Sequence, residues 1–276
     1  MQPTLNLGFM ILPSMGVSIL CGTLLGFLLL FLLRKKTTIL GEHTLDGLIW
    51  AILLGFAGMK ILYWIVSPVP LPKTWSDFWS VISEGMVFYG GLIGGLLGVF
   101  ICAKRKNESF FDYMDYFAPA FCLAHAGGRI GCLLAGCCYG IKWQGALAVH
   151  LNGADRLPVQ PMEAIFLVLL SGFLTLLFIR RRRRGLVAGA YLTLYSVWRF
   201  IIEFFRGDPE RGFLGKLSTS QWISIVTLAG GILLIVLSRK WIITRTPVNE
   251  TKAEETLASE TETEGNATDA AEPSAQ

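Results

Sequence analysis

This sequence contains a series of apolar stretches, each close to the length of a membrane-spanning helix. A helix needs roughly 20 apolar residues to cross a bilayer. Only 16% of the residues are charged, and these are gathered in short runs between the apolar stretches. The pattern predicts an all-α integral membrane protein. About seven transmembrane helices are expected, at residues 15–33, 47–66, 87–103, 116–135, 164–179, 186–205 and 222–237.

Basic residues follow every second apolar stretch, at residues 34–36, 104–106, 180–184 and 239–240 with Arg245. Loops rich in Lys and Arg stay on the cytoplasmic side of a membrane. The alternation therefore predicts that the N-terminus lies outside and the C-terminus in the cytoplasm. We expect residues 1–245 to form the membrane domain. Residues 246–276 are rich in Glu and Thr, and we expect a disordered, acidic cytoplasmic tail there.

Glycines mark the third and fourth stretches. Gly90, Gly94 and Gly98 stand four residues apart, and Gly91 and Gly95 repeat that spacing. The spacing is typical of close helix packing, or of a glycine-lined groove for a lipid chain. Residues 127–140 hold five further glycines, which disfavour a plain helix end. Irregular backbone there, with free N–H groups, would suit an anionic ligand.

Five ionisable residues fall inside the predicted spans: Lys60, His125, Arg129, Arg199 and Glu203. Such residues cost several kcal/mol unless they are paired or hydrated, so they indicate function. Arg199 and Glu203 share one helix face, and Arg206 continues it. One interpretation is a neutralised pair that fixes packing. With Arg129, however, the group carries excess positive charge, which favours a lipid phosphate as counter-ion.

Two of these residues allow a second interpretation. His125 precedes Arg129 by one helical turn and is either a hydrogen-bonded packing residue or a general base. The neighbouring cation favours the neutral imidazole that a base requires. Lys60 either extends its amine to the membrane surface or contacts a lipid headgroup.

The six cysteines do not have the paired spacing of a zinc site, so no metal is expected. Cys132, Cys137 and Cys138 are interpreted as buried apolar residues, a disulfide or reactive groups. Adjacent cysteines such as Cys137 and Cys138 seldom pair with each other, for geometric reasons.

Six motifs in order resemble the prolipoprotein diacylglyceryl transferase family, at residues 58–63, 88–94, 128–140, 156–163, 195–209 and 218–222. The resemblance implies transfer of the diacylglyceryl group of phosphatidylglycerol to the lipobox cysteine of a prolipoprotein signal peptide. It implies a bacterial cytoplasmic (inner) membrane location, with membrane lipid as environment, no cofactor and no nucleic-acid partner. Matching functional positions are Arg129, Arg199, Glu203 and Gly140.

The sequence departs from the family at several positions. Cys132 and Cys137 stand where the family usually has Asn and Glu, Tyr89 where it has His, and Lys60 where it has Arg. A functional Tyr is expected near Met15 and is missing. His125 could supply the base missing at Tyr89.

We therefore expect Arg129, Arg199, Glu203 and His125 to be catalytic. The residues expected to bind the lipid phosphate are Arg129, Arg199, Arg206, Lys60 and Gly140. Tyr89, Cys132, Cys137, Gln160 and Glu163 are expected to line the site. The departures leave two alternatives open: a non-catalytic lipid-binding or lipid-moving protein, and a transferase for another thiol acceptor or phospholipid.

Overall fold

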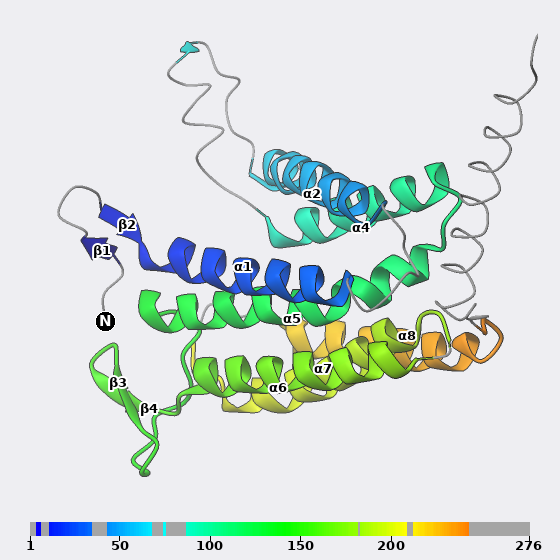
Figure 1. The fold of residues 1–276 in the computed structure, drawn as a ribbon. Coiled ribbons are helices and arrows are strands. Elements are labelled where there is room, and N and C mark those ends of the chain that lie inside the picture. Colours follow the sequence, from blue (N-terminus) through cyan, green and yellow to red (C-terminus); the bar gives the residue numbers. More distant parts are fainter. Residues whose placement is uncertain are drawn as a thin grey trace, which may run out of the picture. The chain divides into compact units, whose positions relative to one another are not determined.

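The computed structural model describes residues 4–6, 11–34, 43–67, 74–75, 87–181, 183–208 and 212–242. Up to Trp241 they belong to one compact unit, and of the second unit only Ile242 is described. The predicted tail at residues 246–276 therefore lies outside the described residues. The unit is mostly helical (Figure 1): α1 Ser14–Arg34, α2 Thr44–Val66, α4 Phe88–Arg105, α5 Phe110–Ala135, α6 Val159–Arg180, α7 Leu186–Ile202 and α8 Thr219–Ser238.

The predicted class is confirmed. Each predicted span overlaps one of these helices, and six described helices are long and apolar enough to cross a membrane. The chain is therefore a multi-pass membrane protein. The count of seven spans and the direction of the termini stay predictions.

Helix α5 begins at Phe110, earlier than the predicted residue 116, because two acidic residues in its first turns are neutralised. Arg181 pairs with Asp115 and, at 3.0 Å, with Asp112. Asp115 also accepts hydrogen bonds from the backbone N–H groups of Gly185 (2.9 Å) and Ala188 (2.8 Å), at the start of α7. A carboxylate at a helix N-terminus satisfies its free N–H groups. This network joins α5, α6 and α7 at one end of the bundle.

The glycines of α4 pack against the backbone of α2, which confirms the packing interpretation for three of them. A Cβ atom added to Gly90, Gly94 or Gly98 would lie 2.1–2.2 Å from a carbonyl oxygen of α2. Gly91 and Gly95 instead line an apolar cavity. One glycine series therefore packs against α2 and the other lines a cavity, while the use of that cavity by a lipid chain stays a prediction.

We expect Gly58→Ala to lower the thermal unfolding temperature of the purified protein. Its new Cβ would lie 2.2 Å from the Gly90 carbonyl oxygen, between two backbones that have no side chain to move aside. Overpacking of this kind typically costs about 1–3 kcal/mol. Gly172→Ala is the matched control, because no atom lies within 4 Å of its added Cβ. Equal unfolding temperatures for the two variants would contradict the α2–α4 packing.

The described residues also form three antiparallel hairpins: β1 Thr4–Asn6 with β2 Ile11–Pro13, β3 Val149–Leu151 with β4 Ala154–Arg156, and β5 Phe213–Leu214 with β6 Leu217–Ser218. In β3–β4, His150 lies opposite Asp155. The turn between them is Asn152-Gly153, and both residues have positive φ. That dipeptide is a strong hairpin signal, yet the hairpins were not predicted.

Candidate active site

Charged side chains from separate elements meet where α5 ends and α6 begins, which we call the α5–α6 end of the bundle. Arg129 comes from the last turns of α5, Glu163 from the first turns of α6 and Arg199 from the last turn of α7. A 3₁₀ turn, η2 Glu203–Phe205, continues α7 and carries Glu203. Arg206 follows directly after η2.

Glu163 bridges two arginines. Its Oε1 lies 3.0 Å from Nη2 of Arg129, and its Oε2 lies 3.9 Å from Nη1 of Arg199. Its side chain is only 3% exposed, so water screens these pairs little. The structure thus places the two predicted phosphate ligands, Arg129 and Arg199, on either side of one buried carboxylate.

Glu203 and Asp208 extend the cluster along the end of α7. Arg199 pairs with Glu203 at 2.9 Å and donates a hydrogen bond to Ser220 at 3.0 Å. Arg206 lies 3.7 Å from Glu203. It also binds Asp208 through two nitrogens, at 3.0 Å and 2.6 Å. Such a bidentate pair fixes a guanidinium plane.

The prediction of excess positive charge was wrong. The cluster balances three guanidinium groups against three carboxylates: Arg129, Arg199 and Arg206 against Glu163, Glu203 and Asp208. The prediction had counted only Glu203 as a counter-ion, because Glu163 belongs to another helix and Asp208 to a loop. An anion that enters must therefore compete with carboxylates for the arginines.

Tyr195 connects His125 to this cluster, although sequence reasoning gave it no role. Its hydroxyl donates to Oε1 of Glu163 at 2.9 Å and lies 3.4 Å from Nε2 of His125. Tyr195 precedes Arg199 by one helical turn, so the two share a face of α7. That spacing was the signal that could have identified it.

The hydrogen bonds of Tyr195 favour one tautomer of a neutral His125. Because the Tyr195 hydroxyl proton points to Glu163, Nε2 of a neutral His125 is the donor toward the Tyr195 oxygen. Nδ1 then keeps its lone pair, and among the described residues this buried atom has no hydrogen-bond partner.

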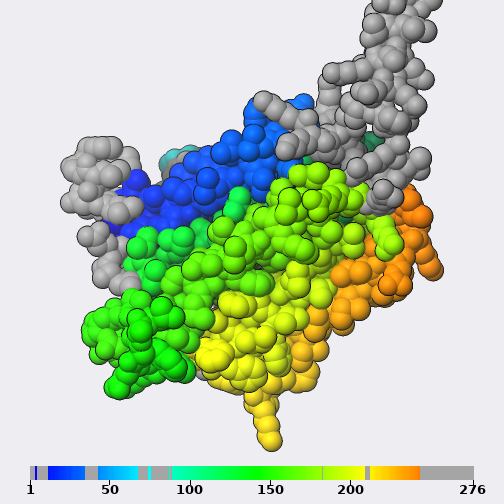
Figure 2. Space-filling model, turned by 60° about the horizontal axis from the view of Figure 1, so that its bottom comes forward, coloured from blue at the N-terminus to red at the C-terminus, as the bar shows by residue number. Residues whose placement is uncertain are grey.

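The backbone around Gly140 ties the loop after α5 to the end of α7. Gly140 forms a β-bridge with Arg206, and Ile141 donates to the carbonyl oxygen of Phe205 at 3.0 Å. A Cβ at Gly140 would lie 2.3 Å from the carbonyl oxygen of Leu157, so no larger residue fits. In Figure 2 the green surface of the β3–β4 segment adjoins the yellow surface around the end of α7. Gly140 thereby positions Arg206.

The expectation of irregular backbone was wrong for residues 127–135, which belong to the regular helix α5. Gly127 and Gly131 let α5 approach α1 instead: added Cβ atoms would lie 2.4 Å from the Ser18 carbonyl oxygen and 3.1 Å from Cα of Met15. Amide groups inside a helix are already hydrogen-bonded, so those before residue 136 are not available to an anion.

Helix α5 ends at Gly136, where φ is +75°. The N–H of Gly136 donates to the Leu133 carbonyl oxygen and that of Cys137 to Cys132. These two bonds form a Schellman motif, the common glycine-terminated helix end. Cys132 and Cys137 therefore lie close together. The predicted residue Gln160 is buried beside them and donates to the carbonyl oxygen of Cys137 at 2.8 Å.

The cysteine side chains at this helix end differ in acidity. A hydrogen bond from Cys132, helped by the nearby guanidiniums of Arg206 and Arg129, lowers the pKa of Cys138 to about 6 against the burial that opposes it. Burial raises the pKa of Cys137. Cys138 is thus the thiol of this group that most readily ionises at neutral pH.

Lys60 and Tyr89 come from the other pair of helices. Lys60 is buried on α2, and Tyr89 is 49% exposed in the first turn of α4. Their membership of the site stays a prediction.

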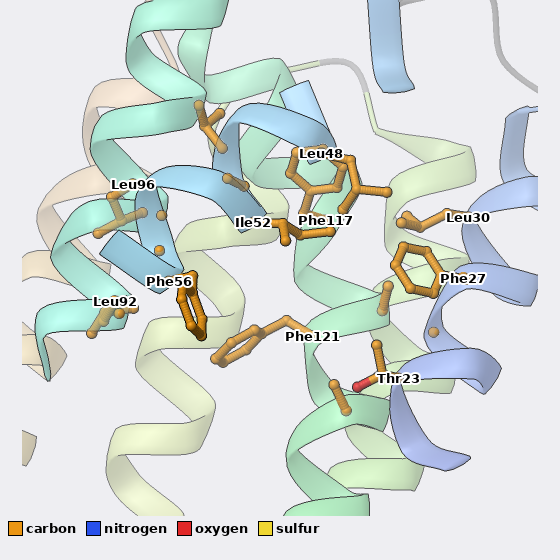
Figure 3. Close-up of a pocket in the computed structure, with 18 of the residues that line it drawn as sticks. Thr23, Phe27, Leu30, Leu48, Ile52, Phe56, Leu92, Leu96, Phe117 and Phe121 are labelled. Atoms are coloured by element: carbon orange, nitrogen blue, oxygen red, sulfur yellow. The ribbon is translucent and has the colours of Figure 1, made fainter. Parts of the chain in front are cut away.

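An apolar cavity of about 500 Å³ lies between α1, α2, α4 and α5. Phe56 of α2 and Phe121 of α5 reach toward each other across it, and among the described lining residues only Thr23 has a polar side chain (Figure 3). The lining reaches Ala124, which directly precedes His125 in α5. The apolar lining suits a hydrocarbon chain, and it includes the residue directly before His125.

A bundle of helices long and apolar enough to cross a membrane, with a buried, charge-balanced cluster and an apolar cavity inside it, defines the class as a multi-pass membrane protein. Residues 3–237 match the family described as prolipoprotein diacylglyceryl transferase. The chain therefore belongs to the prolipoprotein diacylglyceryl transferase family, as the motifs predicted.

Curated relatives carry the same name. A protein of Clostridium perfringens, called phosphatidylglycerol–prolipoprotein diacylglyceryl transferase 2, is 37% identical over 235 residues, covering 82% of this chain and 88% of the relative. A Clostridium tetani transferase is 35% identical, covering 81% and 92%. One from Idiomarina loihiensis is 31% identical, covering 72% and 76%.

Proposed function

We propose that this chain transfers the diacylglyceryl group of phosphatidylglycerol to the lipobox cysteine thiol of a prolipoprotein signal peptide. The observation that carries the proposal is the buried Glu163, which holds Arg129 and Arg199 side by side next to His125. The acceptor thiolate attacks the glycerol carbon that bears the phosphate. A sulfur–carbon bond forms, the carbon–oxygen bond to phosphate breaks, and glycerol phosphate leaves.

Arg129 and Arg199 stabilise the charge that develops on the departing phosphate. Guanidinium groups bind phosphate oxygens through two parallel hydrogen bonds. Within the described residues, Nη1 of Arg199 makes only the 3.9 Å ion pair to Glu163 and no hydrogen bond. This nitrogen can therefore donate to a phosphate oxygen. Arg206, held by Asp208 and the Gly140 bridge, lies at the rim of the same cluster.

His125 takes the proton of the acceptor thiol. A thiol must ionise to become the nucleophile, and Nδ1 of His125 offers a buried lone pair for that proton. The positive charge formed on the imidazole is compensated through Tyr195 and Glu163. Gln160 and Glu163 are positioning residues. Gln160 holds the backbone of Cys137, and Glu163 holds the two arginines.

The apolar cavity receives an acyl chain of the lipid. Its wall reaches residue 124, so a chain inside it leaves the headgroup near Arg129. The reaction would take place in the bacterial cytoplasmic membrane, with the α5–α6 end toward the outside. This orientation follows from the basic loops and accounts for a site on the side where translocated signal peptides arrive.

The test uses the full chain, reconstituted in vesicles of phosphatidylglycerol with a synthetic lipobox peptide. Mass spectrometry should find a peptide that carries one diacylglyceryl group on cysteine. Replacing the peptide cysteine by serine, or phosphatidylglycerol by phosphatidylcholine, should abolish the product. Growth of cells depleted of their own transferase should return when this chain is expressed.

Two results would contradict the proposal. Binding of phosphatidylglycerol without any product would indicate a non-catalytic lipid-binding protein. Product from another phospholipid, with none from phosphatidylglycerol, would indicate a different donor. A variant with both Arg129→Ala and Arg199→Ala should lose the product, which excludes a contaminating transferase as its source.

A further inference from the structure

Three thiols meet at the carboxyl end of α5. The sulfur atoms of Cys132, Cys137 and Cys138 all lie within 4.8 Å of one another. All three cysteines are free and partly buried. The proposed transfer reaction gives none of them a role, and two of them stand where the family usually has other residues.

Local backbone structure explains why this sequence spacing brings the thiols together. The Schellman motif folds the chain back at Gly136, so that Cys137 returns beside Cys132. Cys138 has a φ of +55°, in the left-handed region, and this second turn keeps its side chain near the other two. The spacing resembles no zinc motif because a helix end, rather than a loop between two cysteine pairs, places the ligands.

Neighbouring side chains hold this turn in place. Gln160 donates to the carbonyl oxygen of Cys137 at 2.8 Å, and Asn152 of the β3–β4 turn donates to that of Gly136 at 3.0 Å. Supporting hydrogen bonds of this kind orient the ligands of a metal and strengthen its binding.

We propose that Cys132, Cys137 and Cys138 bind one Zn²⁺ ion through three thiolates. Thiolate sulfur is a preferred ligand of zinc. Within the described residues no fourth His, Cys, Asp or Glu joins the group. A water molecule or another external ligand therefore completes the tetrahedral coordination. Each sulfur that binds exchanges its proton for the metal, and the proton passes to water.

Charge favours the bound form despite the nearby arginines. Three thiolates and Zn²⁺ together carry one net negative charge. The guanidiniums of Arg129 and Arg206 lie near enough to interact with Cys138. They oppose a free dication but stabilise the anionic zinc–thiolate complex.

The first test measures zinc in the full chain, purified in detergent without chelator. We expect one zinc per chain by elemental analysis, and Co²⁺ substitution should give a sulfur-to-metal charge-transfer band. Cys132→Ser, Cys137→Ser and Cys138→Ser should each weaken zinc affinity by at least about 100-fold, beyond the 10–100-fold typical of losing a supporting residue. Cys21→Ser on α1 is the matched control and should keep the zinc.

The second test needs no variant, so it stands even if a serine variant fails to fold. The unaltered chain is alkylated with and without Zn²⁺, and the labelled peptides are identified by mass spectrometry. Zinc should slow labelling of Cys132, Cys137 and Cys138 at least about tenfold and leave the exposed Cys21 unchanged. Equal labelling with and without zinc would overturn the proposal. A Cys132–Cys138 disulfide in the protein as isolated would also overturn it.

Discussion

Replacing Arg199 by alanine should reduce diacylglyceryl transfer by about 10³-fold or more, which is the effect of losing one preorganised cation at a departing phosphate. Arg199 is also the arginine that contacts both Glu163 and Glu203. Arg199→Lys should restore only a small part of the activity, because an ammonium cannot form two parallel hydrogen bonds. The measurement is the initial rate of peptide modification. Arg239→Ala, at an exposed arginine, is the matched control.

A loss of activity caused by unfolding can be separated from a loss of catalysis. Arg199→Ala leaves Glu203 buried with one partner fewer, and breaking a buried ion pair costs about 3–5 kcal/mol. Combining Arg199→Met with Glu203→Gln removes both charges of the pair and should restore most of the thermal stability. It should not restore transfer. If the double variant regained activity, Arg199 would be a packing residue and the phosphate assignment would be wrong.

His125→Ala should lower the transfer rate by about 10²–10⁴-fold, the usual contribution of a general base, while binding of phosphatidylglycerol persists. The decisive variant is His125→Gln. Its amide can place an N–H near the Nε2 position, and so keep the contact to Tyr195, but it carries no basic nitrogen. A packing histidine would tolerate this change, whereas a base would not. Unchanged turnover in His125→Gln would therefore reject the base.

Tyr195→Phe provides a graded comparison for the histidine. It removes the hydroxyl between His125 and Glu163 but leaves the imidazole lone pair. We expect a decrease of about tenfold, consistent with one lost hydrogen bond to a charged group. A loss as large as that of His125→Ala would mean that the hydroxyl itself transfers the proton.

The helical architecture could be predicted because membrane spans follow from the length and polarity of single segments. Errors arose where charge was taken as a helix boundary. Asp112 and Asp115 lay outside the predicted span, but Arg181, directly after the end of α6, neutralises them. Only the fold reveals such a partner. The β3–β4 hairpin could have been predicted locally from Asn152-Gly153.

Some members of the cluster could be predicted from the sequence, but Tyr195, Asp208 and the charge balance could not. Arg199 and Glu203 are neighbours on one helix, so spacing alone predicted their pair. Glu163 reaches the same place from a different helix, and its role as the central counter-ion depends on packing. The grouping of Cys132, Cys137 and Cys138 was predictable in part. Gly136, which lies between Cys132 and Cys137 in the sequence, could have indicated the helix end that brings their sulfur atoms together.

The equal number of acidic and basic groups at the α5–α6 end bears on how a reaction cycle finishes. Glycerol phosphate carries more negative charge than the phosphodiester from which it is formed, and a purely cationic pocket would retain it. Here Glu163 and Asp208 lie close enough to the arginine guanidiniums to form ion pairs with them again. On the proposed function, we expect these carboxylates to compete with glycerol phosphate for the arginines and so to favour its release before the next lipid binds.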